Sequence, residues 1–526
     1  MATVGCRITS EGHYGTVRFI GKVPPTSGEW LGVEWDNPER GKHDGMHEGQ
    51  RYFQTSHPTS GSFVREKKAE FGISYLEALI DRYGLPEDEN MGIEKSEWFV
   101  KTYGQRQKAV EMVGAEKVAR KQSDFKKLSE VALREMRISS ADNEDEIQDT
   151  TPNVTELDLS KNLLSSWEEV AKITRSMKSL KVLKLSENLV ELPSEPSVMT
   201  PAFQNVETLF INHMKLTWSE VVAIAAMFQN LKNLHVCFNQ ISKVEKNENI
   251  FQSLELLNLE SNHISEWNQV KNLGHLPRLT TLILNNNAIE RIQFEDTSFG
   301  AKTSSFQHLK SISLNDNKLN SWQDVNELDK LAGLEEVRLK RNPFLKDEKS
   351  FIIRQLLIAK IGALINCNGS EVPTIERRTA ELDYLKKFGQ EWLKSGGDRD
   401  PARNRPNGEF CKNHPRYHTL LEIYGAPEDS EMSAAPSTAL KNTLIHVSIT
   451  CPQKPETKTV SKKLPGSMTV QKLKMLIQRL FKVSTSDQKL AYISKKIGEP
   501  EVEIDNDMRQ LSFYSIENED TIVVKF

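Results

Sequence analysis

A pattern of the form LxLxxNxL recurs eight times in the middle of the chain. Its copies begin at residues 157, 183, 209, 234, 257, 282, 312 and 337, at intervals of 23 to 30 residues. The alternation of apolar residues predicts a short strand in each unit, with the two leucine-type side chains turned inward. Units of this length bury a continuous core only by stacking on their neighbours, so we expect a solenoid over residues 153–345.

The array resembles the leucine-rich repeat family. In seven units an asparagine stands where it is expected to bond backbone groups at the turn, and the third unit has Met214 there, which predicts an irregular turn. Trp-x-x-Val pairs follow four of the turns, and we expect these tryptophans to be structural residues of outer helices. The asparagines are Asn162, Asn188, Asn239, Asn262, Asn287, Asn317 and Asn342, and the pairs are Trp167/Val170, Trp218/Val221, Trp267/Val270 and Trp322/Val325.

The residue between the two inward positions of each strand is expected to face the concave surface. These residues combine charges of both signs with two apolar side chains, a mixture that suits a protein partner better than a small molecule or a phosphate backbone. A solvated face without a partner is the alternative. The predicted surface residues are Asp158, Lys184, Phe210, His235, Asn258, Ile283, Ser313 and Arg338.

The first 72 residues predict a small, strongly bent β-domain. Nine glycines between residues 12 and 61 separate short apolar runs such as TVRFIG and WLGVEW, and that density of turn residues between β-favouring segments is typical of tight β-structures. We expect Trp35 and Phe63 to be core residues. Trp30 and Phe53, which flank the segment GKHDG at residues 41–45, are expected to line a pocket.

This segment resembles the CAP-Gly (cytoskeleton-associated protein, glycine-rich) family through GTVRFIG, GEWLGVEWD, GKHDG, GQRYF and GSFVR, in order between residues 15 and 65. The resemblance implies a groove for acidic C-terminal tails that end in an aromatic residue, notably that of α-tubulin. An aromatic pocket would take the terminal ring, backbone N–H groups of the glycine turn would receive the carboxylate, and Lys42 would supply charge. The implied site residues are Trp30, Lys42, His43, Asp44, Gly45, Arg51 and Phe53.

Two sequence features affect how the predicted groove would bind an acidic tail. His43 stands where the family turn usually has asparagine, which changes the hydrogen-bond geometry and predicts pH sensitivity. Residues 1–70 contain nine Lys/Arg and nine Asp/Glu, so attraction of an acidic tail depends on the local cluster Lys22, Arg40, Lys42 and Arg51.

The remaining segments predict connections and a third module. Apolar spacing over 105–138 predicts a helical shield for the first repeat, within a helical and acidic linker at 73–152, and the acidic run 139–152 is expected to be a loop. Helical patterns over 346–426 predict a cap, and 427–443 has the composition of a flexible linker. From residue 444 the order ββαββ resembles the ubiquitin-like β-grasp fold, and because VVKF lacks a diglycine we expect a built-in docking module rather than a conjugated modifier. Between Lys454 and Lys482 eight Lys/Arg face one acid, which indicates either an acidic partner or a solvated helix face.

The composition and the motifs that do not occur argue against several classes of function. A formal net charge of −4 argues against nucleic-acid binding, and five scattered cysteines indicate reduced thiols. We find no signal pattern and no membrane-spanning run, so we expect a cytoplasmic protein with no membrane partner. No phosphate-binding loop or catalytic signature occurs, so we expect no enzyme activity and no cofactor. Cys411, His414 and His418 have a zinc-like spacing but lack a fourth ligand, and His43 and His47 lie in a glycine-rich turn, so we expect no metal site.

We therefore expect a multidomain protein of mixed α+β and α/β class. The order of its three modules resembles the tubulin-folding cofactor family. That resemblance implies an ATP-independent, cytoskeleton-associated chaperone that receives α-tubulin from cofactor B, works with cofactors C and D to release the heterodimer, and can also dissociate it. Two alternatives remain: a CAP-Gly adaptor at microtubule ends, and a ubiquitin-pathway shuttle that brings tubulin to the proteasome through the C-terminal module.

Overall fold

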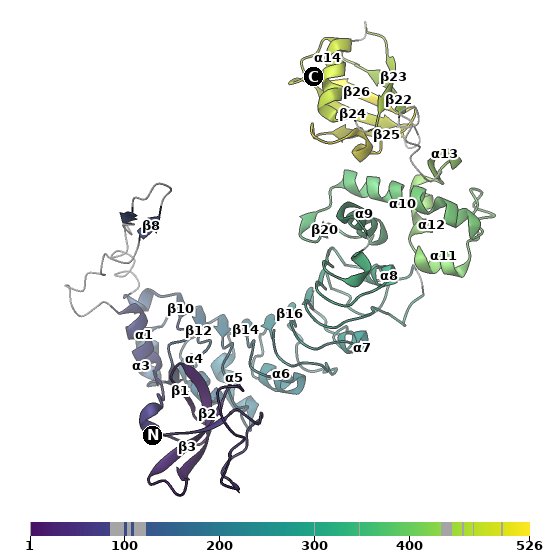
Figure 1. The fold of residues 1–526 in the computed structure, drawn as a ribbon. Helices are drawn as coiled ribbons and strands as arrows, with labels where there is room; N and C mark the ends of the chain where they lie inside the picture. The colour runs from purple at the N-terminus through teal and green to yellow at the C-terminus, as the bar shows by residue number, and fades with distance from the viewer. Residues whose placement is uncertain are drawn as a thin grey trace. The chain divides into compact units, whose positions relative to one another are not determined.

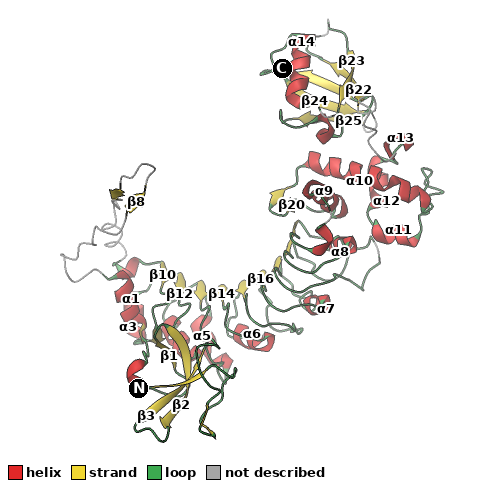
Figure 2. Cartoon of the chain, viewed as in Figure 1, coloured by secondary structure: helices red, strands yellow, loops and turns green. Residues whose placement is uncertain are grey.

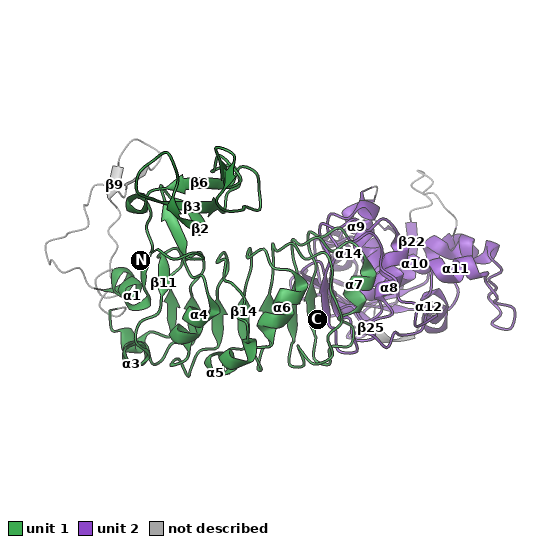
Figure 3. Ribbon diagram, turned by 90° about the horizontal axis from the view of Figure 1, so that it is seen from below, with its two compact units in different colours: residues 1–288 green, residues 289–526 purple. Residues whose placement is uncertain are grey.

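The computed structural model describes residues 2–84, 99–101, 107–109, 123–298, 300–346, 348–432, 444–454, 457–466, 468–495 and 498–526. The chain forms two compact units, residues 1–288 and 289–526, which Figure 3 shows in different colours. Within the described part of the chain, no helix is long and apolar enough to span a membrane.

The first unit begins with a four-stranded antiparallel sheet in the order β1-β2-β3-β6. Apolar side chains from alternating positions of these strands form its core with Trp35, which is 2% exposed, as expected. The strands are β1 (Arg7–Ser10), β2 (His13–Lys22), β3 (Glu29–Trp35) and β6 (Gly61–Val64), followed by the 3₁₀ turn η1 (Glu66–Lys68), and a short hairpin joins β4 (Met46–His47) to β5 (Gln50–Arg51).

The repeats follow as parallel strands in register, with the leucine-type residues of each strand fully buried. Figure 2 shows that the strands lie along one side of the array, with short helices on the other. In the first unit the strands are β10 (Glu130–Ala132), β12 (Glu156–Asp158), β13 (Val182–Lys184), β14 (Thr208–Phe210), β15 (Asn233–His235), β16 (Leu256–Asn258) and β17 (Thr281–Ile283). The helices are α4 (Trp167–Thr174), η3 (Pro196–Met199), α5 (Thr200–Phe203), α6 (Trp218–Ala225) and α7 (Trp267–Lys271).

Helices α4, α6 and α7 each begin at a tryptophan of the Trp-x-x-Val pairs, and these three tryptophans are buried. The expectation that they are structural is confirmed. Ser166 caps α4 and Thr217 caps α6, so the residue before the tryptophan satisfies the free N–H groups of the first turn.

The asparagines form a buried ladder, as expected. Asn262 is typical: its Nδ2 donates to the carbonyls of Val236 and Leu259 at 3.0 Å each, and its Oδ1 accepts from the N–H of Ile241 at 3.2 Å. Each asparagine therefore joins two neighbouring repeats. The residue before it has a positive φ in every unit, for example Ser261 at 57°.

The third unit has the irregular turn that Met214 predicts. Here both His213 and Lys215 have positive φ, at 55° and 59°. Met214 is buried and replaces the missing amide with apolar packing. Asn239 of the next repeat compensates, because its Oδ1 accepts from the N–H groups of both Met214 and Leu216 at 3.0 Å.

The N-terminal shield differs from the expected helix over 105–138. Residues 110–122 lie outside the described part of the chain, but Val131 and Leu133 belong to a strand-and-turn unit with Met136 at the asparagine position, an additional degenerate repeat. The predicted helix is wrong here, because Val131 and Leu133 alternate with the period of a strand. Strands β8 (Phe99–Lys101), β9 (Gln107–Ala109) and β11 (Ile138–Ser140) and the 3₁₀ turn η2 (Phe125–Lys127) complete this region.

Helices α1 (Tyr75–Tyr83) and α3 (Glu144–Thr150) complete the shield instead. Strand β7 (Ile73–Ser74) pairs with β11, and Tyr75, Ala78 and Leu79 of α1 are fully buried. Residues 139–152 were expected to be a loop, but α3 forms within them. Asn143 caps it, three acids occupy its first turn, and Ile147 is buried. Acidic side chains stabilise a helix N-terminus, so an acidic run does not exclude a helix.

The second unit contains the last repeats and a helical cap. The two expected helical patterns are confirmed as α9 and α10, and Tyr384, Trp392 and Tyr417 form the centre of the cap core. The elements are β18 (Ser311–Ser313), α8 (Trp322–Leu328), β19 (Glu336–Arg338), η4 (Pro343–Leu345), α9 (Ser350–Lys360), β20 (Asn366–Cys367), β21 (Ser370–Glu371), α10 (Thr374–Lys394), α11 (Gly408–Asn413), α12 (Tyr417–Tyr424) and α13 (Asp429–Met432). The linker expected at 427–443 contains α13, and its residues 433–443 lie outside the described part.

The C-terminal module is a β-grasp in which α14 packs on a five-stranded sheet of order β23-β22-β26-β24-β25, as expected. Glycine, proline and glutamates interrupt the apolar alternation in strand β25, so the sequence pattern does not predict this strand. The elements are β22 (Leu444–Thr450), β23 (Val460–Pro465), α14 (Val470–Phe481), β24 (Lys489–Ser494), β25 (Gly498–Ile504), η6 (Leu511–Tyr514) and β26 (Thr521–Lys525) (Figure 1).

Candidate functional site

Phe63 is the centre of an aromatic cluster on the N-terminal domain. Its side chain is half-buried, and its ring meets its neighbours mostly edge to face, the arrangement that aromatic quadrupoles favour. The ring centroids lie 5.0 Å from His43, 5.5 Å from Tyr52, 5.5 Å from Phe53, 6.0 Å from His47 and 6.4 Å from Phe19. This partly exposed surface offers apolar contact to a ring from another molecule.

Phe53 and Phe63 have exchanged their expected places. Phe53, expected to line the pocket, is only 6% exposed, whereas Phe63, expected in the core, is partly exposed. A Cβ on Gly32 would come within 2.5 Å of the Phe53 ring, so glycine is required there for this ring to pack inward. The register of strand β6 decides which side of the sheet Phe63 occupies, and the sequence pattern does not determine this register.

The glycine turn is held by strand-like bonds to β6. The N–H groups of Lys42 and His43 donate to the carbonyl of Gly61 at 2.7 and 3.2 Å, and the N–H of Gly61 donates to the carbonyl of His43 at 2.7 Å. Gly45 has a φ of 95°, which favours glycine. Because these turn N–H groups already have acceptors, they are not free to receive a carboxylate, contrary to the expected mechanism.

The glycine turn carries one ion pair and one lysine that has no ion pair among the described residues. Arg51 bonds the Asp44 carboxylate at 2.8 Å, and this contact lowers the pKa of Asp44. Lys42 is exposed and forms no ion pair with any described residue. Lys42 is therefore the cation of the turn that remains available to an anionic ligand.

His43 takes the acceptor role that an asparagine carbonyl would have. Its Nδ1 accepts from the N–H of Gly45 at 3.0 Å, so the neutral ring carries its proton on Nε2. Burial and the nearby His47 lower the pKa of His43, while Asp44 opposes the shift. Neutral His43 therefore presents an N–H donor beside Lys42.

Trp30 lies under Arg65 rather than within the aromatic cluster. The Arg65 guanidinium carbon lies 3.7 Å from the centre of the Trp30 ring, and the indole N–H donates to Thr26 at 2.7 Å. Its strand partner is Gly21, at the far end of β2 from the pairing of Gly15 with Trp35. A bound peptide can therefore contact the Trp30 ring only next to the Arg65 guanidinium.

The predicted ladder on the repeats is aligned by the strand register. Asp158, Lys184, Phe210, His235, Asn258 and Ile283 are successive partners in the first unit, and Ser313 pairs with Arg338 in the second. Ser313 is 5% exposed, so it does not contribute to an accessible surface.

Two stacked aromatic pairs dominate the middle of this face. The rings of Phe210 and His235 stack at 4.1 Å and 6°, and those of His213 and Phe238 stack at 4.3 Å and 9°. Phe238 is 48% exposed. Burial lowers the pKa of His235 to about 4, so this ring is neutral at physiological pH.

His213 and Phe238 were missed by the sequence reasoning. Both occupy the positive-φ position before the asparagine site. That position is marked in the sequence as the fifth residue of each LxLxxN unit, and it supplies a second column of side chains beside the predicted ladder.

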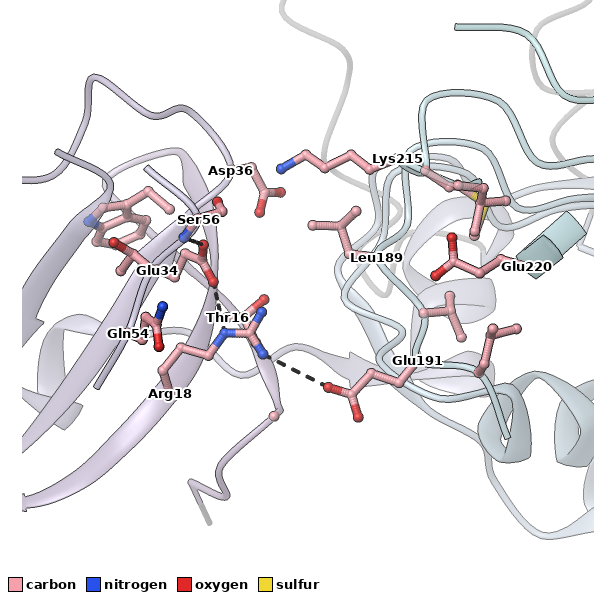
Figure 4. Close-up of a pocket in the computed structure, with 17 residues that line it drawn as sticks. Thr16, Arg18, Glu34, Asp36, Gln54, Ser56, Leu189, Glu191, Lys215 and Glu220 are labelled. Atoms are coloured by element: carbon pink, nitrogen blue, oxygen red, sulfur yellow. Dashed lines mark hydrogen bonds and ion pairs between the residues drawn. The ribbon is translucent and has the colours of Figure 1, made fainter. Parts of the chain in front are cut away.

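A cleft of about 740 Å³ lies within the first unit, between strands β2 and β3 of the N-terminal sheet and the turns of the second and third repeats (Figure 4). Arg18 reaches across it, 2.9 Å from Glu34 and 3.9 Å from Glu191. The Arg137–Glu70 pair, at 2.8 Å, and the pairing of β7 with β11 also join the sheet to the repeats. The groove and the part of the strand face from Asp158 to Ile283 therefore belong to one compact unit.

Of the zinc-like trio in the cap, His414 serves packing. His414 is buried, and its Nδ1 lies 2.6 Å from the Tyr384 hydroxyl. Burial and the charge of Lys360 lower the pKa of His414 to about 3. Within the described residues, no group of three His, Cys, Asp or Glu side chains is arranged to hold a metal ion.

Known proteins match this chain over nearly its whole length. The CAP-Gly domain family matches residues 4–69, and the ubiquitin-like domain family matches residues 444–525. The zebrafish (Danio rerio) tubulin-specific chaperone E is 45% identical over 524 residues, 99% of each chain. The chain belongs to the tubulin-specific chaperone E family.

Other members of the tubulin-specific chaperone E family agree with this assignment. The human (Homo sapiens) member is 43% identical over 99% of this chain and 98% of its own. The solution structure of the ubiquitin-like domain of mouse tubulin-specific chaperone E is 41% identical, with a TM-score of 0.16, and covers 18% of this chain and 92% of that chain. The resemblance to tubulin-folding cofactors and the CAP-Gly, leucine-rich repeat and ubiquitin-like modules expected from the sequence are confirmed.

Proposed function

We propose that this protein is a tubulin-folding chaperone that binds α-tubulin at two places. The N-terminal groove takes the acidic C-terminal tail, and the strand face of the repeats contacts the folded body. The observation that carries the proposal is the identity, over the full chain, to proteins named for a chaperone activity specific to tubulin.

At the groove, the aromatic terminal residue of the tail packs on the Phe63 cluster, and its carboxylate meets Lys42 and the Nε2–H of His43. Charge-assisted hydrogen bonds of this kind are stronger than neutral ones. The turn N–H groups hold the shape of the site rather than the ligand, because Gly61 accepts from two of them.

At the repeats, Phe210, His235 and Phe238 are the central contacts. Clustered aromatic side chains in the middle of an interface carry a large share of binding energy. A tail held in the groove raises the local concentration of the tubulin body at these aromatic residues, since they and the groove belong to the same compact unit.

The protein acts in this proposal by binding alone, as a cytoplasmic, cytoskeleton-associated non-enzyme without a cofactor. It works with tubulin cofactors B, C and D in assembling the heterodimer and can separate existing heterodimers. For dissociation, the area buried on the repeats must rival the tubulin dimer contact, and a standard interface of roughly 1,600 Å² is sufficient if its central contacts are good.

Titration of the full protein into native tubulin heterodimer, and into heterodimer lacking the acidic α-tail, tests the proposal. We expect dissociation of the native heterodimer and a clear loss of activity on the tail-less one. Stable binding to polymerised microtubules without dissociation would support the adaptor, and proteasome capture dependent on residues 444–526 would support the shuttle.

A further inference from the structure

Charge is segregated within the C-terminal domain. Residues 454–482 contain eight Lys/Arg and one acid, whereas residues 483–526 contain five Lys/Arg and nine Asp/Glu. Strand β23 from the cationic segment and strand β25 from the acidic one form opposite edges of the sheet. The domain therefore has one cationic and one acidic side.

The cations gather beside the outer side of helix α14. Its inner positions, Val470, Leu473, Ile477 and Phe481, are buried in the domain core. At 3.6 residues per turn, the opposite side of the helix carries Lys472, Met475 and Arg479, and Lys482 follows at the C-cap. Lys462 of β23 pairs with buried Val447, so it lies on the same side of the sheet as α14. We call Lys462, Lys472, Arg479 and Lys482 the cationic face.

The domain does not neutralise this face. No ion pair joins any of its four cations to a described residue. Several acids of the other side have partners within the domain: Asp507 bonds Lys474 at 2.7 Å, Glu501 pairs with Lys525, and Glu519 pairs with Lys495. Asp520 accepts from the N–H groups of Lys495 and Glu517. The unbalanced charge is therefore positive, and it is exposed on one side.

The chemistry of the face selects among anionic partners. Three of its four cations are lysines, which bind anions as point charges rather than through the planar fork of arginine. Its outer helix positions carry no aromatic ring on which a base could stack. Met475 is the large apolar side chain exposed there, which is too little apolar surface to enter a bilayer.

We propose that the cationic face of the ubiquitin-like domain binds an acidic, extended peptide segment of a partner protein. This site is separate from the N-terminal groove and needs no C-terminal aromatic residue. It gives the chain a second contact for an acidic polypeptide, at the opposite end of the sequence.

The test uses the full-length protein and a fluorescein-labelled poly-glutamate peptide that ends in glycine, titrated at physiological ionic strength. We expect the double variant Lys472→Glu/Arg479→Glu to weaken binding by about tenfold or more, since two exposed contacts become repulsive. The matched control Lys412→Glu/Lys489→Glu changes net charge equally at exposed cations elsewhere and should bind as the parent does. Lys42→Ala, which disables the N-terminal groove, should also leave this binding intact.

Several outcomes would overturn the proposal. Equal weakening in both double variants would show a net-charge effect, and no measurable binding by the parent would exclude the site. Tighter binding to a single-stranded oligonucleotide or to anionic vesicles would assign the face to another class of ligand. Self-association abolished by the Lys472→Glu/Arg479→Glu variant would assign it to a second copy. The milder Lys472→Gln/Arg479→Gln variant repeats the test if charge reversal prevents folding.

Discussion

Single residues at the glycine turn decide how the groove recognises charge. Lys42 is exposed and unpaired among the described residues, while Arg51 is committed to Asp44. We expect Lys42→Ala to weaken binding of an acidic tail peptide with a terminal aromatic residue by roughly 1–3 kcal/mol, the range for a central interface contact. Isothermal titration with the peptide measures this effect. Lys67→Ala, at an exposed lysine of the same domain outside the cluster of Lys22, Arg40, Lys42 and Arg51, is the control, and equal losses would refute the assignment.

His43 predicts a pH dependence of the same domain. Its folded pKa is lowered, mainly by burial, so the unfolded chain binds the proton more tightly. This contribution to stability is complete above the ordinary pKa of histidine and is lost as pH falls through the lowered folded pKa. Protonation also removes the Nδ1 acceptor from Gly45.

We therefore expect the melting temperature of the protein's N-terminal transition to fall between pH 7 and pH 5 by more than it does in the His43→Asn variant. Asparagine keeps an acceptor for Gly45 but does not titrate in this range. Thermal scans across this pH range provide the measurement. Parallel pH profiles for the two proteins would show that His43 does not control this dependence.

At the scale of the element, the asparagine ladder joins one repeat to the next. Asn262 makes bonds to two repeats while buried. We expect Asn262→Ala to lower the free energy of unfolding by about 2–3 kcal/mol, because two carbonyls and one N–H lose their partner. Chemical denaturation gives the value. Asn249→Ala, at an exposed position of the same unit, should be nearly neutral, and a similar loss there would indicate a general effect of the substitution.

The individual strands and helices also show which elements could be predicted from sequence patterns. The eight strands and the helices that begin at tryptophan follow from apolar spacing, because their burial is nearly complete and the pattern repeats. The degenerate repeat around Met136 and helix α3 were misassigned. A short unit of period two resembles part of a helix, and an acidic run is compatible with a capped helix as well as with a loop.

At the scale of the whole molecule, the two proposed tubulin contacts make separable predictions. We expect Phe210→Asp to reduce dissociation of native heterodimer severalfold, because it breaks the stack with His235 and puts a charge into the centre of the face. Binding of the isolated tail peptide should be unchanged. Val198→Asp, at an exposed apolar position on η3, controls for the added charge. A simultaneous loss of peptide binding would contradict the two-site arrangement.

The sequence by itself determined the module order, the repeat register, the asparagine ladder and the family resemblance. Each of these depends on residue types at fixed spacing, because burial on a strand or at a turn permits few substitutes. Only the tertiary structure decided that Phe63 rather than Phe53 is partly exposed, that the N–H groups of Lys42 and His43 donate to Gly61, and that His213 and Phe238 lie beside the predicted ladder. It also showed that the cations of α14 and β23 share one side of their domain. These facts depend on which face of an element meets which neighbour, and packing between distant segments sets that choice.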